Sequence, residues 1–171
     1  MLCHQAIAEQ LIHEQVPAIG VELWDTVDIG PFRATPVPAQ DWRGANQVAW
    51  VIDTDRMRII QCGDTIWHGS WYEIQRRFGS FDVAFLPINA VLAQLEGFTP
   101  TEVPSTLTPE QAIEAAVVLQ ASTACAIHHG LFHNPPRYVE SPNVVARFLQ
   151  AGARRGVLAI APEDGAAVAI E

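Results

Sequence analysis

The apolar run DVAFLPI, residues 82–88, constrains the fold more than any other segment of the chain. It has the length of one β-strand and lies between Gly79 and Asn89. Because both alternating sets of positions are apolar, the run is typical of a strand that is buried on both faces. The sequence therefore predicts a fully buried strand at this point of the chain.

The segment LTPEQAIEAAVVLQA, which follows a long loop at residues 96–108, has the clearest helix pattern. Thr108 is a good N-cap residue, and Pro109 occupies the first helical position. Gln111 lies three residues after the cap, which is the spacing of a capping box. We therefore expect a helix that begins at Pro109.

Three other segments have helical patterns. In residues 70–78, Ser70 is the expected cap and Glu73 lies three residues on, which predicts a second capping box. Residues 5–14 carry Ile7, Leu11 and Ile12 on one side, and residues 142–155 follow the cap candidate Ser141 and end at Gly156.

Strands are predicted in the remaining patterned segments, at residues 19–24, 32–38, 47–53, 57–62, 123–127, 157–161 and 167–170. The first two are joined by DTVDIGP, which has turn chemistry. The third and fourth form a hairpin that turns at Thr54, Asp55 and Arg56. The last two surround a turn at Glu163–Gly165.

Helices and strands thus mix along the chain, with both hairpins and strand–helix–strand units. This order favours an α/β fold over an all-α or all-β fold. No internal repeat and no linker-like stretch interrupts the 171 residues, so we expect a single domain over residues 1–171.

Composition excludes several classes of protein. A formal net charge of -9 disfavours binding to phosphate backbones, so no nucleic-acid partner is expected. The sequence contains no run of 18 apolar residues, so no membrane span is expected. Its first residues, MLCHQAIAEQ, do not resemble a secretory signal. The three cysteines, Cys3, Cys62 and Cys125, are odd in number and widely spaced, which disfavours disulfides. A cytoplasmic location is therefore expected.

Three predicted loops that follow strands carry side chains able to bind metals. These are Asp41 in PAQDW, Asp64 in CGDT, and His128, His129 and His133 in IHHGLFH. Their spacing alone does not bring them together. Asp64 could equally cap its own turn, Asp41 could be a surface acid, and the histidines could be solvated.

The order of these segments resembles the metallo-β-lactamase superfamily, in the branch of the L-ascorbate-6-phosphate lactonases and the N-acyl phosphatidylethanolamine phospholipase D enzymes. The resemblance runs from about residue 6 to the C-terminus, through the stretches VDIGPFRATPVPAQDW, IIQCGDT, RRFGSFDVAFLPINA, LTPEQAIEAA, AIHHGLF and SPNVVARFLQAGARRGV. It implies an αββα sandwich in which two metal ions lie between two sheets. The HxHxDH motif that supplies most of the family's ligands is absent from the sequence. We therefore expect an incomplete sandwich that corresponds to the C-terminal portion of the fold.

The resemblance also implies roles for individual residues. Asp64 matches the family's bridging aspartate, and His128 matches its last histidine ligand. Asp41 stands where the family has a histidine after PAQ, which makes it a third candidate ligand. His129 and His133 are candidates to support the ligands or to contact a substrate. Asp64 and His128 alone are too few for a tight four-coordinate zinc site.

Two functions follow from this resemblance. The first is a non-catalytic, hydrolase-like protein with a remnant metal site, in which zinc, iron or manganese binds weakly or not at all. The alternative is a metal-dependent hydrolase of ester, lactone or phosphodiester bonds, whose site is completed by an N-terminal segment or by another chain. A chain with little more than one sheet would expose an apolar face, so we expect a homo-oligomer, most simply a homodimer, or a partner chain that covers the sheet.

Overall fold

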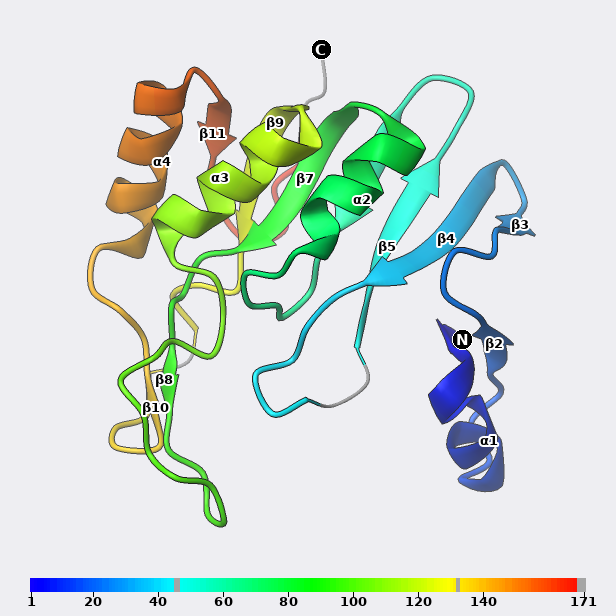
Figure 1. Ribbon diagram of the computed structural model, residues 1–171, viewed down its shortest axis with the longest axis horizontal. Coiled ribbons are helices and arrows are strands. Elements are labelled where there is room, and N and C mark those ends of the chain that lie inside the picture. Colours follow the sequence, from blue (N-terminus) through cyan, green and yellow to red (C-terminus); the bar gives the residue numbers. More distant parts are fainter. Residues whose placement is uncertain (45–46, 132, 169–171) are drawn as a thin grey trace.

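A seven-stranded mixed sheet and three helices form the body of the computed structural model, which describes residues 1–44, 47–131 and 133–168. The strands lie in the order β11-β9-β7-β6-β5-β4-β3, and helices α2, α3 and α4 cover one face of the sheet (Figure 1). The sheet strands are β3 (Val27–Ile29), β4 (Phe32–Pro38), β5 (Val48–Asp53), β6 (Arg58–Gln61), β7 (Phe81–Pro87), β9 (Ala121–Ile127) and β11 (Leu158–Ile160). The helices on it are α2 (Ser70–Phe78), α3 (Pro109–Leu119) and α4 (Val144–Arg155). The expected α/β class is confirmed.

The sheet has an antiparallel half and a parallel half. Strands β3 to β6 form consecutive antiparallel pairs, and β6, β7, β9 and β11 run parallel to one another. Parallel neighbours need a crossover connection, and each of the three crossovers contains one of the helices. The carboxyl ends of the parallel strands therefore lie along one edge of the sheet.

The buried strand predicted from DVAFLPI is β7, at the middle of the sheet. Phe81, Val83, Ala84 and Leu86 are each at most 1% exposed. Side chains of β7 pack with those of α2, α3 and α4 in one apolar core, whose large members include Ile60, Ile74, Leu86, Ile113 and Phe148. The position of this strand is confirmed within one residue, but its predicted burial on both faces is incomplete, because Phe85 is only partly buried.

One of the two predicted capping boxes is present. At α3, the Thr108 hydroxyl accepts a hydrogen bond from the Gln111 backbone N–H, and the Gln111 side chain accepts one from the Thr108 N–H. The box at Ser70 is wrong, because Ser70 is already helical and Gly69 is the N-cap, without a side-chain bond. Glu73 instead forms an ion pair of 2.8 Å with Arg77, one turn further along α2.

Two other boundaries differ from the sequence prediction. The segment DTVDIGP contains a strand of its own, β3, which pairs with β4. The preceding strand, β2 (Ile19–Val21), pairs in parallel with β1 (Leu2–His4) instead. Helix α4 begins after Asn143, whose φ of 54° is left-handed, so Pro142 is outside it. In the predicted strand 167–170, residues 167 and 168 are not in a strand, and the rest lies outside the described residues.

The N-terminal residues form a small unit beside the antiparallel half of the sheet (Figure 1). It consists of β1, helix α1 (Gln5–His13) and β2, and α1 lies where the apolar spacing predicts it. Two loop segments after β7 also pair, as β8 (Leu92–Ala93) with β10 (Tyr138–Val139). Among the described residues, no helix is long and apolar enough to cross a membrane.

The sheet face opposite α2, α3 and α4 is apolar as well. Strand register places Ile52 beside Ile59, and Phe85 beside Cys125, on this face. Trp50 lies on the same face, and of these five only Cys125 is fully buried. We call this surface, defined by Trp50, Ile52, Ile59, Phe85 and Cys125, the open face. No helix of the described chain covers it (Figure 1).

Candidate functional site

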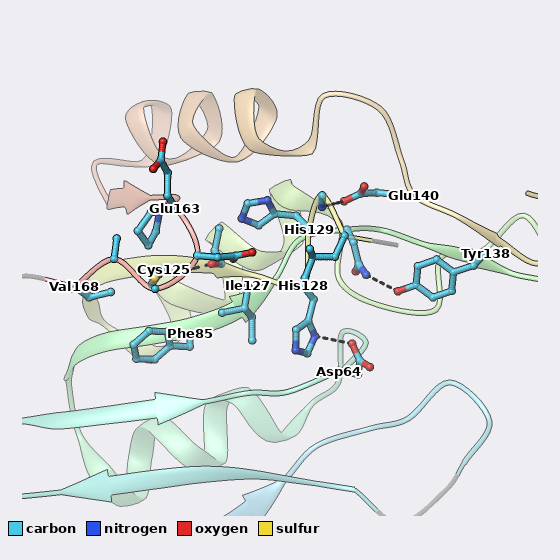
Figure 2. Close-up of a pocket in the computed structure, with 18 residues that line it drawn as sticks. Asp64, Phe85, Cys125, Ile127, His128, His129, Tyr138, Glu140, Glu163 and Val168 are labelled. Atoms are coloured by element: carbon cyan, nitrogen blue, oxygen red, sulfur yellow. Dashed lines mark hydrogen bonds and ion pairs between the residues drawn. The ribbon is translucent and has the colours of Figure 1, made fainter. Parts of the chain in front are cut away.

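Two of the predicted metal ligands meet at the carboxyl edge of the parallel strands. Asp64 follows β6 and His128 follows β9, on either side of β7. Their side chains point toward each other (Figure 2), and Asp64 Oδ1 lies 2.7 Å from His128 Nδ1. The sheet thus joins residues that are 64 positions apart, at the edge where α/β folds place their binding sites.

Backbone conformation aims both side chains. His128 has a left-handed φ of 56°, which is uncommon for a residue with a side chain. Gly63, directly before Asp64, has a φ of 59°, and its N–H donates to Gln61 Oε1. Left-handed residues at these two points turn the chain sharply, which keeps Asp64 and His128 at the ends of β6 and β9.

The pair is electrostatically coupled. The hydrogen bond from His128 is the largest influence on Asp64 and lowers the pKa of its carboxyl group, against the opposing effect of burial. The side chains of Asp64 and His128 are 61% and 41% exposed, so solvent screens the attraction. The contribution of this hydrogen-bonded pair to folding is therefore small.

A cavity of about 500 Å³ lies beside the pair. Phe85, Cys125 and Ile127 line it from β7 and β9, and the C-terminal segment 162–168 forms another wall (Figure 2). Since Phe85 and Cys125 belong to the open face, the cavity lies on the side of the sheet without helices. Its volume is in the range typical of small-molecule sites.

A buried hydrogen-bond network holds another wall of the cavity. The Thr106 hydroxyl is 2.5 Å from Asn89 Oδ1, and Asn89 Nδ2 donates to the Tyr138 hydroxyl at 2.8 Å. Asn89 is only 3% exposed. Burial, followed by the negative charges of Asp64 and Glu140, raises the pKa of Tyr138. Sequence reasoning missed these residues, although Asn89, just after the end of β7, shares the sheet edge with Asp64 and His128.

Glu140 connects the loop that carries His128 and His129 to the wall that contains Tyr138. Its Oε1 accepts a hydrogen bond of 3.0 Å from the Gly130 N–H. His129 and Glu140 both line the cavity, so this bond fixes one side of its mouth. His133 lies elsewhere, in a surface groove that it shares with His129 and the start of α4.

The third candidate ligand, Asp41, lies in a loop next to the Asp64 turn. The Gln40 N–H donates to the Thr65 hydroxyl at 3.1 Å, which joins the two loops. The Asp41 carboxylate, however, accepts hydrogen bonds from the backbone N–H, Nε and Nη2 of Arg43. It is not among the residues that line the cavity. A role for Asp41 in metal binding stays a prediction.

The donor set that the structure brings together does not fit a metal ion by itself. Within residues 1–44, 47–131 and 133–168, no group of three or more His, Cys, Asp or Glu side chains is arranged to hold one. Catalytic zinc sites use three protein ligands and structural sites use four. Asp64 and His128 provide two, and their facing atoms are bonded to each other.

The cysteines provide no further donors. All three are free and buried. Complete burial raises the pKa of the Cys62 thiol, which keeps it protonated and unreactive.

Comparison with known proteins agrees with this architecture. A sequence model described as the β-lactamase superfamily domain matches residues 1–129, three quarters of the chain. No curated protein is significantly similar in sequence.

Solved structures with a similar fold come from several organisms. Igni18, a metallo hydrolase from the archaeon Ignicoccus hospitalis, is 19% identical with a TM-score of 0.74, over 99% of this chain and 68% of its own. An isothiocyanate hydrolase from Delia radicum gut bacteria is 15% identical with a TM-score of 0.69, over 99% and 66%. CmlA, a diiron β-hydroxylase from Streptomyces venezuelae, is 14% identical with a TM-score of 0.68, over 91% and 34%. At these identities the likeness concerns the fold, and this chain spans about two thirds of either hydrolase.

Proposed function

The chain belongs to the metallo-β-lactamase superfamily, and on this premise we propose that it is a hydrolase-like protein with a remnant metal site and no catalytic activity of its own. Asp64 and His128 are the remnant ligands. In relatives with a full site, bound metal ions activate water and stabilise developing negative charge. Here zinc, iron or manganese binds weakly or not at all.

The arrangement of Asp64 and His128 carries this proposal. Their facing atoms, Asp64 Oδ1 and His128 Nδ1, are 2.7 Å apart, a hydrogen-bond distance. A metal ion would have to replace that bond while gaining only two protein ligands. Asp41, the third candidate, is engaged with Arg43.

We further propose that the chain corresponds to the C-terminal portion of the superfamily fold, in the lactonase and phospholipase D-like branch. The order of PAQDW, CGDT and IHHGLF supports this assignment, as does the absence of HxHxDH from these 171 residues.

Metal content of the purified chain tests the proposal. We expect elemental analysis without added metal to find far less than one zinc, iron or manganese per chain, in a protein that is fully folded by circular dichroism. Asp64→Ala should leave the metal content unchanged, as should the matched control Asp55→Ala in the exposed β5–β6 turn. One tightly held metal per chain that is lost in Asp64→Ala, but kept in Asp55→Ala, would contradict the proposal.

A second candidate function is a metal-dependent hydrolase of ester, lactone or phosphodiester bonds whose site is completed by another chain. The open face favours it, because the cavity beside Asp64 lies on that side of the sheet and partly exposed apolar side chains surround it. Such faces typically pack against a second sheet about 10 Å away. A homodimer through this face is the simplest arrangement.

Sedimentation at micromolar concentration tests the homodimer. We expect a dimer that dissociates in Ile59→Glu, at the centre of the open face, but not in Leu149→Glu, at an exposed apolar position of α4. A folded monomer at this concentration would rule out the homodimer.

We also propose that the chain resides in the cytoplasm. Three free, buried thiols are what a reducing cytoplasm favours.

A further inference from the structure

The cavity next to Asp64 has two chemically different ends. Its apolar end is lined by Phe85, Cys125, Ile127 and Val168. Its polar end is lined by Asp64, Asn89, Tyr138 and Glu140. In Figure 2 the apolar side chains lie toward the C-terminal segment, whereas Asp64, Tyr138 and Glu140 lie on the other side of His128. A ligand that fills this space therefore meets hydrocarbon at one end and hydrogen-bonding groups at the other.

The charge of the lining is one-sided. Four carboxylates, those of Asp64, Glu140, Glu163 and Asp164, border the cavity, and no lysine or arginine does so within the described chain. Burial, followed by the negative charges of Asp64 and Glu140, raises the pKa of Tyr138, so these charges act inside the polar end. Glu163 contributes less there, because its carboxylate points away from Asp64 (Figure 2).

We propose that this cavity binds a small amphiphilic cation, with a protonated amine at the Asp64–Glu140 end and an apolar body over Phe85 and Ile127. An ammonium group donates three hydrogen bonds and accepts none, which suits a wall of carboxylates and a phenol oxygen. The apolar body gains from leaving water at the other end. A phosphate or carboxylate ligand would face four carboxylates, with no lysine or arginine among the described residues that line the cavity.

This inference rests on the proposed function, because a metal ion between Asp64 and His128 would put positive charge at the polar end. The size of the cavity, about 500 Å³, accommodates one or two rings with a short side chain. Both the volume and the apolar end are independent of the acidic residues, so the proposal does not depend on charge alone.

Three naphthalene probes of nearly equal size separate the contributions. They are naphthalen-2-ylmethylammonium, naphthalen-2-ylmethanol and 2-naphthoate, titrated by calorimetry into protein that has been treated with a chelator and desalted. We expect the ammonium to bind at least about tenfold more tightly than the carboxylate, with the alcohol between them.

Variants then locate the binding. Glu140→Gln keeps an oxygen that can accept from the Gly130 N–H, so the loop is preserved while the charge is lost. It should weaken the ammonium about fivefold and leave the alcohol unchanged. Ala166→Trp, at an exposed position of the cavity wall, should prevent all three probes from binding. The matched charge control, Glu9→Gln on α1, should change nothing.

The proposal is overturned if the carboxylate binds the metal-free protein as tightly as the ammonium, if no probe binds, or if Ala166→Trp leaves ammonium binding intact. These outcomes are distinct from a failure of the proposed function, which shows as metal retained in untreated protein in an Asp64-dependent manner. Probe preference is measured without metal, so each hypothesis can fail alone.

Discussion

The two faces of the central sheet share their strands but differ in what they do. On the helix-covered face, Val51, Ile60 and Ala84 lie in register and are completely buried in the core. On the open face, the neighbouring residues Ile52 and Ile59 are partly exposed. The cavity lies on the same face, over β7 and β9. Because side chains of a strand alternate, adjacent residues serve different purposes. One face of the sheet therefore provides stability, while the other remains available for binding.

The largest expected effect comes from the adjacent residues Ile60 and Ile59. Ile60→Ala removes a fully buried side chain and should lower the free energy of unfolding by about 3 kcal/mol. Ile59→Ala should cost about 1 kcal/mol, since its side chain is already partly in water. Urea unfolding of both variants measures the difference. Equal losses at low protein concentration would mean that the two faces are equally covered within one chain.

A smaller effect distinguishes two helices on the covered face. Thr108→Ala removes the capping box of α3 and should cost about 1 kcal/mol. Ser70→Ala should have almost no effect, because Ser70 makes no capping bond at α2. Thermal or urea unfolding gives both values. A loss at Ser70 as large as that at Thr108 would restore the capping box that the sequence predicts there.

A still smaller effect on stability is expected from Asp64, which lines the cavity on the open side of the sheet. Its carboxyl pKa is lower in the folded chain than the ordinary 3.8. A lowered pKa stabilises the folded state above the unfolded-state value, and this stabilisation disappears as the pH falls through the folded value. Relative to Asp64→Asn, the protein should therefore lose under about 1 kcal/mol below roughly pH 4. Urea unfolding of both proteins across acid pH measures it, with Asp55→Asn as the exposed control.

The smallest effect is a shift in the ionisation of Tyr138. Burial and the charges of Asp64 and Glu140 raise the pKa of its phenol. Glu140→Gln should lower that pKa toward its ordinary value without reaching it, because burial remains. Ultraviolet difference titration against Tyr138→Phe isolates this residue. An unchanged titration in Glu140→Gln would mean that the carboxylate field does not extend into the cavity.

Sequence reasoning predicts the covered face better than the open one. The run at 82–88 and the Thr108 cap are local patterns, so β7 and α3 can be read directly from the chain. The pairing of β1 with β2 depends on a contact between Cys3 and Gly20, which no short pattern encodes. Strand β3 is only three residues long, and its turn chemistry hid it.

The candidate site divides in the same way. Resemblance to the superfamily selects Asp64 and His128, which the structure brings together. Asn89 and Tyr138 become visible only when β7 and the β10 region are placed side by side. The arginine that engages Asp41 is two residues away, yet its bidentate approach could not be foreseen from composition.

The position of the Asp64–His128 pair also has a consequence for the order in which the strands assemble during folding. The two residues are 64 positions apart, and strand β7 lies between the strands that carry them. Contacts that close long loops form late, because the chain must first lose the entropy of that segment. We therefore expect their approach to coincide with the docking of β9 on β7, later than formation of the local hairpin β5–β6. A distance probe on these two side chains would report the docking of β9 on β7, independently of what the cavity binds.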